Sequence, residues 1–333
     1  MRHPTQPIEK KVAVVGCKHT TKDLILGLAR EGFAIDHCVT ISPEKGESQK
    51  VAGYHDLRPF LDASGIPYTL ANKYSLKSDE DEQQLHDLRL DLLIVMGWQR
   101  LIPDWWLRSL SVGAFGMHGS FKPLPHGRGR SPMNWSLIQN RTLFFTHLFQ
   151  YLPGVDDGPV VGVQRFDLTP FDTAHTVHFK NTIACVKLSA RHLPGLLDGT
   201  AARIPQAEGD ASFWPKRSDE DGLIYWTDTT TDVYNLIRAV TRPFPGAFTY
   251  LDDDRTRLLR VWRAIPFDSH LLWPDAASGT IVEAFYDGTV VVKTGDTTLL
   301  ILESEGHGFS QSDVGRRLGS LDTPRKVWAN LPS

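Results

Sequence analysis

The sequence predicts an α/β protein with an open, mostly parallel twisted sheet and helices on both of its faces, followed by a small C-terminal all-β domain. Two observations support this prediction. Continuous apolar runs alternate with amphipathic segments through most of the chain, which is typical of parallel strands buried on both faces. From about residue 270 onward, short β-prone runs are instead separated by Asp-Gly and Thr-Gly-Asp turns.

The first apolar run, KVAVVG at residues 11–16, predicts a central buried strand. A helix should follow it, with Thr20 or Thr21 as its N-cap. The turn between them contains one glycine, so the glycine-rich fingerprint of dinucleotide-binding folds is absent and NAD binding is disfavoured. Gly16 therefore belongs either to a plain strand-to-helix turn or to a place where a substrate phosphate approaches the backbone.

The remaining elements follow from the same patterns of hydrophobic spacing. Strands are expected at 34–41, 66–70, 91–96, 112–117, 143–151, 160–168, 247–250, 258–265, 280–285, 289–293 and 298–302. Helices are expected at 55–63, 78–88, 173–196 and 229–240, and a polar linker at about 200–222. We accordingly divide the chain into an α/β domain at 1–200, a linker with a helix and hairpin extension at 201–268, and a small β domain at 269–333.

Composition excludes several classes of protein. A net charge of -3 over 333 residues gives no basic footprint for a polyanion, so no nucleic-acid partner is expected. The three cysteines lack metal-ligand spacing and fit reduced thiols in a cytoplasm, and no metal site is expected. No apolar run reaches the roughly 18–20 residues of a membrane span, and the N-terminus lacks the apolar core of a signal peptide. We therefore expect a cytoplasmic protein without a membrane partner.

The stretch GAFGMHGSFKPLPHGRGRSPMNW at 113–135 contains the densest group of reactive residues. The predicted strand would deliver His118 at its C-terminal end, where open α/β sheets collect their ligands. Glycines and prolines then exclude regular structure, while Arg128 and Arg130 would place cations where an anion could bind. Ser131 and the proline after it predict the N-cap and first residue of a helix.

The combination of HGS, a proline-containing loop, RGRSPMNW and a later GVDDG at 154–158 resembles the N10-formyltetrahydrofolate-dependent formyltransferases. RGRSPMNW and IRAVTRPFPGAFTY at 237–250 are most similar to members that N-formylate nucleotide-linked amino sugars. The resemblance covers roughly residues 11–265. It implies a formyltransferase-like fold, N10-formyltetrahydrofolate as co-substrate, and a nucleotide-activated deoxyamino sugar as acceptor, for surface polysaccharide such as lipopolysaccharide O-antigen. A homodimer remains an open alternative to a monomer.

The resemblance also implies roles for individual residues. His118 would relay the proton that the acceptor amine gives up, and Asp156 would orient the imidazole, with Asp157 as the adjacent alternative. The residues implied around the folate are Met96, Gly97, Trp98, Arg100, Ile102, Val155 and Asp156. The residues implied for the sugar nucleotide are Gly16, Ser120, Arg128 and Arg130.

One position departs from the family. The family has an asparagine two residues before the histidine, where this chain has Gly116. That asparagine donates a hydrogen bond to the formyl oxygen, and a glycine cannot do so. Three alternatives remain open: protonated His118 stabilises the oxyanion alone, Ser120 or Asn134 supplies the donor, or catalysis is impaired and the protein only binds folate.

A second alternative concerns the acceptor. A methionyl-tRNA formyltransferase also carries a small C-terminal β domain. From residue 270 onward, however, this chain has eight acidic residues against five basic ones, which is a poor surface for tRNA. The sugar nucleotide is therefore the favoured acceptor.

Overall fold

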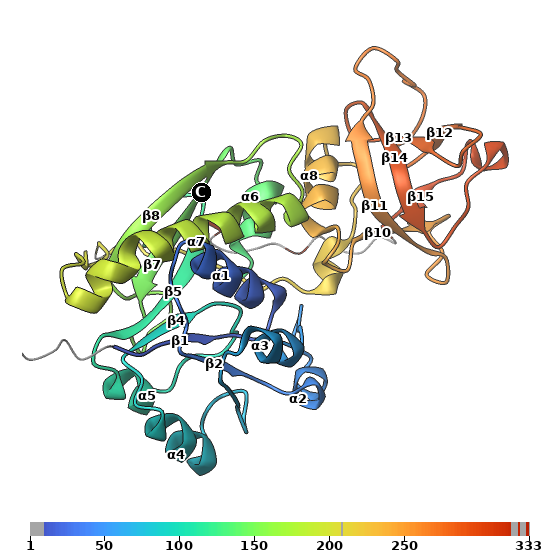
Figure 1. Cartoon of the computed structure of the whole chain (residues 1–333). Helices are drawn as coiled ribbons and strands as arrows, with labels where there is room; N and C mark the ends of the chain where they lie inside the picture. The colour runs from blue at the N-terminus through green and yellow to red at the C-terminus, as the bar shows by residue number, and fades with distance from the viewer. Residues whose placement is uncertain (1–9, 208, 321–325, 327–330, 333) are drawn as a thin grey trace, which may run out of the picture.

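The computed structural model describes residues 10–207, 209–320, 326 and 331–332. Within them, a seven-stranded sheet has the strand order β3-β2-β1-β4-β5-β7-β8. The first five of these are parallel, and β7 pairs antiparallel with both β5 and β8, which confirms an open, mostly parallel sheet (Figure 1). The strands are β1 (Val12–Val15), β2 (His37–Thr40), β3 (Tyr68–Leu70), β4 (Leu92–Val95), β5 (Gly113–Ser120), β7 (Leu143–Gln150) and β8 (Val160–Asp167).

Helices cover both faces of this sheet, as expected. Along β1, Val12 and Val14 face the cluster formed with the helices His19–Arg30 and Ala174–Asp198. Ala13 and Val15 face the cluster formed with the helices Asp79–Asp87 and Asp104–Ser109. Burial of each valine side chain contributes about 1.5–3 kcal/mol, which explains why the strand shows no polar alternation. The helices are α1 (His19–Arg30), α2 (Pro43–Ser48), α3 (Arg58–Ser64), α4 (Asp79–Asp87), α5 (Asp104–Ser109), α6 (Pro132–Ile138) and α7 (Ala174–Asp198).

Of the two predicted helix caps, the one at Thr20 or Thr21 is wrong and the one at Ser131 is confirmed in position. Helix α1 begins after Lys18, so Thr21 lies in its first turn, where its hydroxyl accepts from the backbone N–H of Lys18 at 3.2 Å. The same hydroxyl donates to the carbonyl of Met96 at 2.7 Å and connects the helix to the end of β4. Ser131 is the N-cap residue of α6 and the following proline begins the helix, as predicted, but Ser131 has a left-handed backbone (φ 58°) and its side chain makes no cap hydrogen bond.

The described residues of the polar segment, 201–207 and 209–222, pack against the α/β domain, whereas we expected a linker. Its strand β9 (Phe213–Trp214) pairs with β6 (Arg128–Gly129) in the loop after β5. The Trp214 ring is buried and stacks on Trp135, with centroids 5.8 Å apart and planes 6° apart. The sequence did not indicate this contact, because a single buried tryptophan in a polar segment does not produce a periodic pattern of apolar residues.

The C-terminal part forms a second sheet of six strands among the described residues, in the order β12-β13-β14-β11-β10-β15 with antiparallel neighbours. Its members are β10 (Ala247–Leu251), β11 (Leu258–Pro266), β12 (Ile281–Ala284), β13 (Val290–Lys293), β14 (Thr298–Glu305) and β15 (Leu318–Gly319). The division expected at residues 268 and 269 falls between β11 and β12, inside this one sheet. The β11–β14 pairing that unites it is long-range, so local patterns do not reveal it.

Helix α8 (Thr230–Val240) joins the two parts and lies between them (Figure 1). It packs against α6 and α7 on one side and against β10, β11 and β14 on the other. Apolar residues from both parts therefore form one continuous core, with Val177 of α7 and Leu299 of β14 as members. Among the described residues, no helix combines the length and the apolar character needed to cross a membrane.

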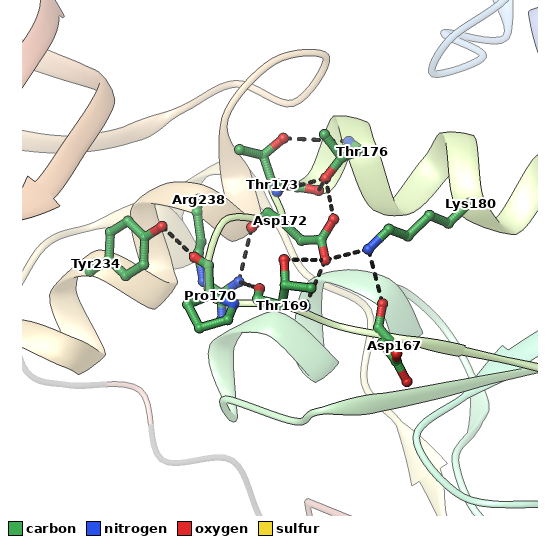
Figure 2. Close-up of polar contacts among 9 residues, drawn as sticks. All are labelled: Asp167, Thr169, Pro170, Asp172, Thr173, Thr176, Lys180, Tyr234 and Arg238. Carbon is green, nitrogen blue, oxygen red and sulfur yellow. Dashed lines mark hydrogen bonds and ion pairs between the residues drawn. The ribbon is translucent and has the colours of Figure 1, made fainter.

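A polar network fixes α8 to the turn that precedes α7 (Figure 2). The buried guanidinium of Arg238 donates to the carbonyls of Thr169 at 3.0 Å and of Asp172 at 2.9 Å. The Tyr234 hydroxyl donates to the Pro170 carbonyl in the same turn at 2.5 Å. Burial alone would raise the pKa of Asp172, but hydrogen bonds led by the one from Lys180 outweigh it and lower the pKa below its ordinary value.

The change Arg238→Leu tests this network. It removes the Arg238 donor from the buried Asp172 carbonyl and one of two donors from the Thr169 carbonyl, which keeps the backbone N–H of Asp172 at 3.1 Å. We therefore expect the free energy of unfolding to fall by about 1–3 kcal/mol in urea denaturation. Arg108→Leu is the matched control, because Arg108 forms an exposed pair with Asp104 and should contribute less than about 1 kcal/mol. Equal losses in the two variants would show that the buried network does not stabilise the junction.

Candidate active site

A cavity of about 500 Å³ lies at the carboxyl ends of β4 and β5. Its walls come from the loop after β4, the end of β5 with the loop that follows it, and the connection between β7 and β8. Ligands of open α/β sheets bind at this edge, and the volume lies within the usual range for small-molecule sites. The described part of the chain therefore has a ligand-sized pocket at the place where the sequence predicted the site.

His118 lies at the floor of this cavity with both ring nitrogens near an acceptor. Nε2 is 2.7 Å from the carbonyl oxygen of Gly127, and Nδ1 is 3.3 Å from Oδ2 of Asp156. A carbonyl oxygen can only accept a hydrogen bond, so Nε2 carries a hydrogen and donates it. Nδ1 is therefore the ring atom that can gain or lose a proton.

Asp156 lies in the connection between β7 and β8, which folds back over β5. Its Oδ2 accepts from the backbone N–H of Gly129 at 3.1 Å in addition to facing His118. The residue has a left-handed backbone (φ 52°), which costs a non-glycine residue free energy and is often found at functional sites. The carboxylate is thus held between the imidazole and the loop after β5.

The neighbouring carboxylate is placed elsewhere. The side chain of Asp157 lies against Gly154, so closely that a Cβ atom on that glycine would collide with the carboxylate. The only ion pair that the described residues form with His118 is the one with Asp156. The sequence left both aspartates open, and the structure brings Asp156 to the histidine.

A second histidine supports the first from the adjacent strand. His147 on β7 lies opposite His118 and is buried. Its Nδ1 donates to the carbonyl of His118 at 3.1 Å, and its Nε2 accepts from the backbone N–H of Leu124 at 3.2 Å. Both contacts require the neutral ring with its hydrogen on Nδ1, and burial lowers the pKa of His147 to about 4. Its place inside an aromatic, β-prone run gives no sequence signal for this role.

Gln206, in the segment expected to be a linker, ties the two site loops together. Its amide nitrogen donates to the carbonyls of Asp156 at 2.7 Å and Gly158 at 2.8 Å, while its amide oxygen accepts from Arg128 at 2.6 Å. One side chain thereby holds both the aspartate loop and the arginine. A lone glutamine in a polar stretch gives no sequence signal for this role.

The implied folate residues separate into two groups. Trp98, Arg100, Ile102 and Val155 line the cavity together with Asp156. Met96 and Gly97 lie just before this wall and shape the turn, since Met96 binds Thr21 and Gly97 has a φ of 80° that favours glycine. Their contact with a ligand stays a prediction.

The implied sugar-nucleotide residues are more dispersed. Arg130 is exposed and lines the cavity. Arg128 is bound by Gln206, and Ser120 is buried with its hydroxyl donating to the carbonyl of His126 at 2.6 Å. Gly16 is buried where any Cβ would collide with the Met96 carbonyl, so close packing of β1 against β4 explains the glycine.

Gly116 is covered by the side chain of Tyr151, which also lines the cavity. A Cβ atom on Gly116 would come within 2.5 Å of both Cζ and the hydroxyl oxygen of Tyr151. The two alternative donors are engaged elsewhere: Ser120 as described, and Asn134 through a 2.6 Å bond to the carbonyl of Ala239. Neither of them lines the cavity.

The sequence matches two models of one protein family. Residues 10–185 match the formyl transferase domain, and residues 216–311 match the formyl transferase C-terminal domain. The first match alone covers more than half of the chain. This chain belongs to the formyl transferase family. The resemblance inferred from HGS, RGRSPMNW and GVDDG is thereby confirmed, and the enzyme class is formyltransferase.

Solved structures of similar fold agree with this family. HypX from Aquifex aeolicus in complex with tetrahydrofolic acid has a TM-score of 0.63 at 16% identity, covering 88% of this chain and 44% of its own. The N-formyltransferase from Helicobacter canadensis, in complex with folinic acid and dTDP-3-aminofucose, has a TM-score of 0.62 at 14% identity. The match covers 89% of this chain and 100% of the Helicobacter chain. WlaRD, a sugar 3N-formyltransferase, has a TM-score of 0.61 at 13% identity, and the match covers 90% of this chain and 98% of the WlaRD chain. This formyltransferase chain thus spans less than half the length of HypX.

The buried His147 makes stability depend on pH. Its folded pKa of about 4 lies below the unfolded value of about 6.5, so the unfolded chain binds a proton first as the pH falls. We expect its contribution to stability, up to about 3 kcal/mol, to be lost between about pH 6.5 and pH 4. Urea denaturation across this range should show that the free energy of unfolding falls less with decreasing pH for His147→Gln than for the wild type. His270→Gln, an exposed control, should keep the wild-type slope, and identical slopes for all three proteins would contradict this assignment.

Proposed function

We propose that this formyltransferase moves the formyl group of N10-formyltetrahydrofolate to the amine of a nucleotide-activated deoxyamino sugar, in the synthesis of a surface polysaccharide. The observation that carries the proposal is the His118–Asp156 pair at the floor of a ligand-sized cavity, at the carboxyl end of β5. The folate and dTDP-sugar ligands of the Helicobacter canadensis enzyme, which has the same fold, support both substrates.

The reaction needs a neutral amine, an electrophilic formyl carbon and a proton relay. The amine nitrogen attacks the formyl carbon, a C–N bond forms, and the carbonyl electron pair moves to oxygen. The proton that the amine loses passes to Nδ1 of His118, directly or through the Asp156 carboxylate 3.3 Å away. The oxyanion then collapses, the bond from carbon to N10 breaks, and N10 takes up the proton. The products are the formamide and tetrahydrofolate.

The cavity walls suit the two parts of this reaction. Apolar and aromatic side chains from the loop after β4, including Trp98 and Ile102, can enclose a pterin ring. The lining also includes the exposed Arg130, and Lys18, the N-cap residue of α1, is near enough for the two charges to interact. Burial lowers the pKa of Lys18, and the positive charge of Arg130 acts in the same direction. A phosphate of the sugar nucleotide would relieve this repulsion.

The decisive experiment uses a panel of UDP-, dTDP-, GDP- and CMP-linked amino sugars. A ligand at 100 times its Kd adds about 2.7 kcal/mol to stability, so the matching sugar should raise the Tm most. The same sugar should support release of tetrahydrofolate from N10-formyltetrahydrofolate. A protein that formylates methionyl-tRNA but none of the sugars would contradict the proposed acceptor.

Two neighbouring substitutions test the catalytic pair. Asp156→Asn removes the charge beside His118 and should lower turnover by about 10²- to 10⁴-fold, comparable to His118→Ala. Asp157→Asn is the matched control one residue away, and it should have a smaller effect because its carboxylate lies against Gly154. Both aspartate variants should bind folate nearly as well as the wild type. If the order of the two effects were reversed, Asp157 would be the catalytic carboxylate.

The change Arg130→Met tests the phosphate contact. A charge-assisted hydrogen bond contributes about 1.5–3 kcal/mol, so KM for the sugar nucleotide should rise about 10- to 100-fold. The Kd for folate should not change. Arg165→Met on β8, whose exposed side chain lies outside the cavity, is the control and should behave like the wild type. An unchanged KM in Arg130→Met would remove this arginine from the binding site.

A further inference from the structure

The side chain of Tyr151 occupies the space beside Gly116. Its hydroxyl oxygen lies 2.5 Å from the position that a Cβ atom on Gly116 would take. An asparagine amide nitrogen is two bonds from its own Cβ, at a similar separation. The hydroxyl therefore lies as close to the strand at residue 116 as the amide of an asparagine there would lie.

The position of the Tyr151 ring is fixed by the strands below it. The backbone N–H of Tyr151 donates to the carbonyl of Ala114 on β5 at 2.8 Å, just beyond the end of β7. The ring packs against Phe149, with centroids 5.2 Å apart, and Phe149 pairs directly with Gly116. Only a residue without a side chain at 116 leaves room for the ring, which explains the glycine.

The Tyr151 hydroxyl is available as a donor. Tyr151 lines the same cavity as His118 and Asp156, and its hydroxyl has no hydrogen bond within the described part of the chain. Burial, and then the negative charge of Asp156, raise the pKa of Tyr151 above its ordinary value, so the phenol keeps its proton. The other side chains considered for this role, Ser120 and Asn134, are buried and already donate to backbone carbonyls.

We propose that the Tyr151 hydroxyl donates a hydrogen bond to the formyl oxygen and stabilises the oxyanion, in the place of the asparagine that Gly116 lacks. The inference rests on the proposed formyl transfer. In this arrangement Tyr151 donates to the formyl oxygen, whereas His118 and Asp156 accept and transfer the proton of the amine. Oxyanion stabilisation and proton transfer are therefore carried out by different side chains. Tyr151 is then a catalytic residue, and Gly116 is the position that gives it space.

The first test is Tyr151→Phe, which keeps the ring and removes the donor. One preorganised oxyanion donor changes the rate by about 10²- to 10³-fold, and we expect that loss in kcat with little change in KM for folate. Tyr234→Phe is the control, because it removes a hydroxyl that donates to the Pro170 carbonyl far from the cavity. A Tyr151→Phe turnover within about threefold of the wild type would overturn the inference.

The second test exchanges the two donors. Gly116→Asn alone must displace the ring and should lower the rate, and Tyr151→Ala alone should do the same. The double variant Tyr151→Ala/Gly116→Asn gives the amide the vacated space and should regain at least about tenfold over Tyr151→Ala, a non-additive result. A double variant no faster than Tyr151→Ala, or a Gly116→Asn faster than the wild type, would contradict the exchange.

A folate-binding measurement distinguishes a wrong role for Tyr151 from a wrong acceptor substrate. If the wild type formylated none of the amino sugars, the proposed acceptor would be wrong, but the contact could still be measured. Tyr151→Phe should weaken binding of a stable N10-formyl folate analogue several-fold, about what one hydrogen bond contributes, and leave tetrahydrofolate binding unchanged. Equal changes for both ligands would show that Tyr151 does not contact the formyl group.

Discussion

The antiparallel pairing of β7 with β5 is the constraint on which the site depends. This pairing puts His147 opposite His118 and Phe149 opposite Gly116. Because β7 runs antiparallel to β5, it ends beside Phe115, away from the carboxyl end of β5, and the chain must fold back toward the cavity before it returns as β8. The turn carries Tyr151 and Asp156 back over the end of β5. One register of strand pairing thus determines which groups line the cavity.

A set of buried backbone contacts then makes the site rigid. Each ring nitrogen of His147 has a fixed backbone partner, and Nε2 of His118 donates to Gly127. Gln206 connects the loop that carries Asp156 to the loop that carries Arg128. Side chains held in this way need little reorganisation when charge develops, which is the condition under which a donor or a carboxylate is most effective.

Local patterns in the sequence were sufficient for the sheet and for much of the site. The unbroken apolar runs gave the parallel strands, and HGS with RGRSPMNW and GVDDG led to His118 and Asp156 and to the formyl transferase family. The contributions of Tyr151, His147, Gln206 and Trp214 depend on contacts between segments far apart in the chain. An aromatic residue at a strand end or a glutamine in a polar stretch looks the same whether or not it supports a site.

The path of residues 201–214 has a consequence for how the protein can be divided. All seven strands of the first sheet are complete before residue 200. A fragment ending there would nevertheless lose Gln206, the partner strand of β6 and the Trp214 side chain that stacks on Trp135. The smallest unit with an intact pocket therefore extends beyond its last strand, and a protease cut in this segment would loosen the loops that line the cavity while leaving the sheet in place.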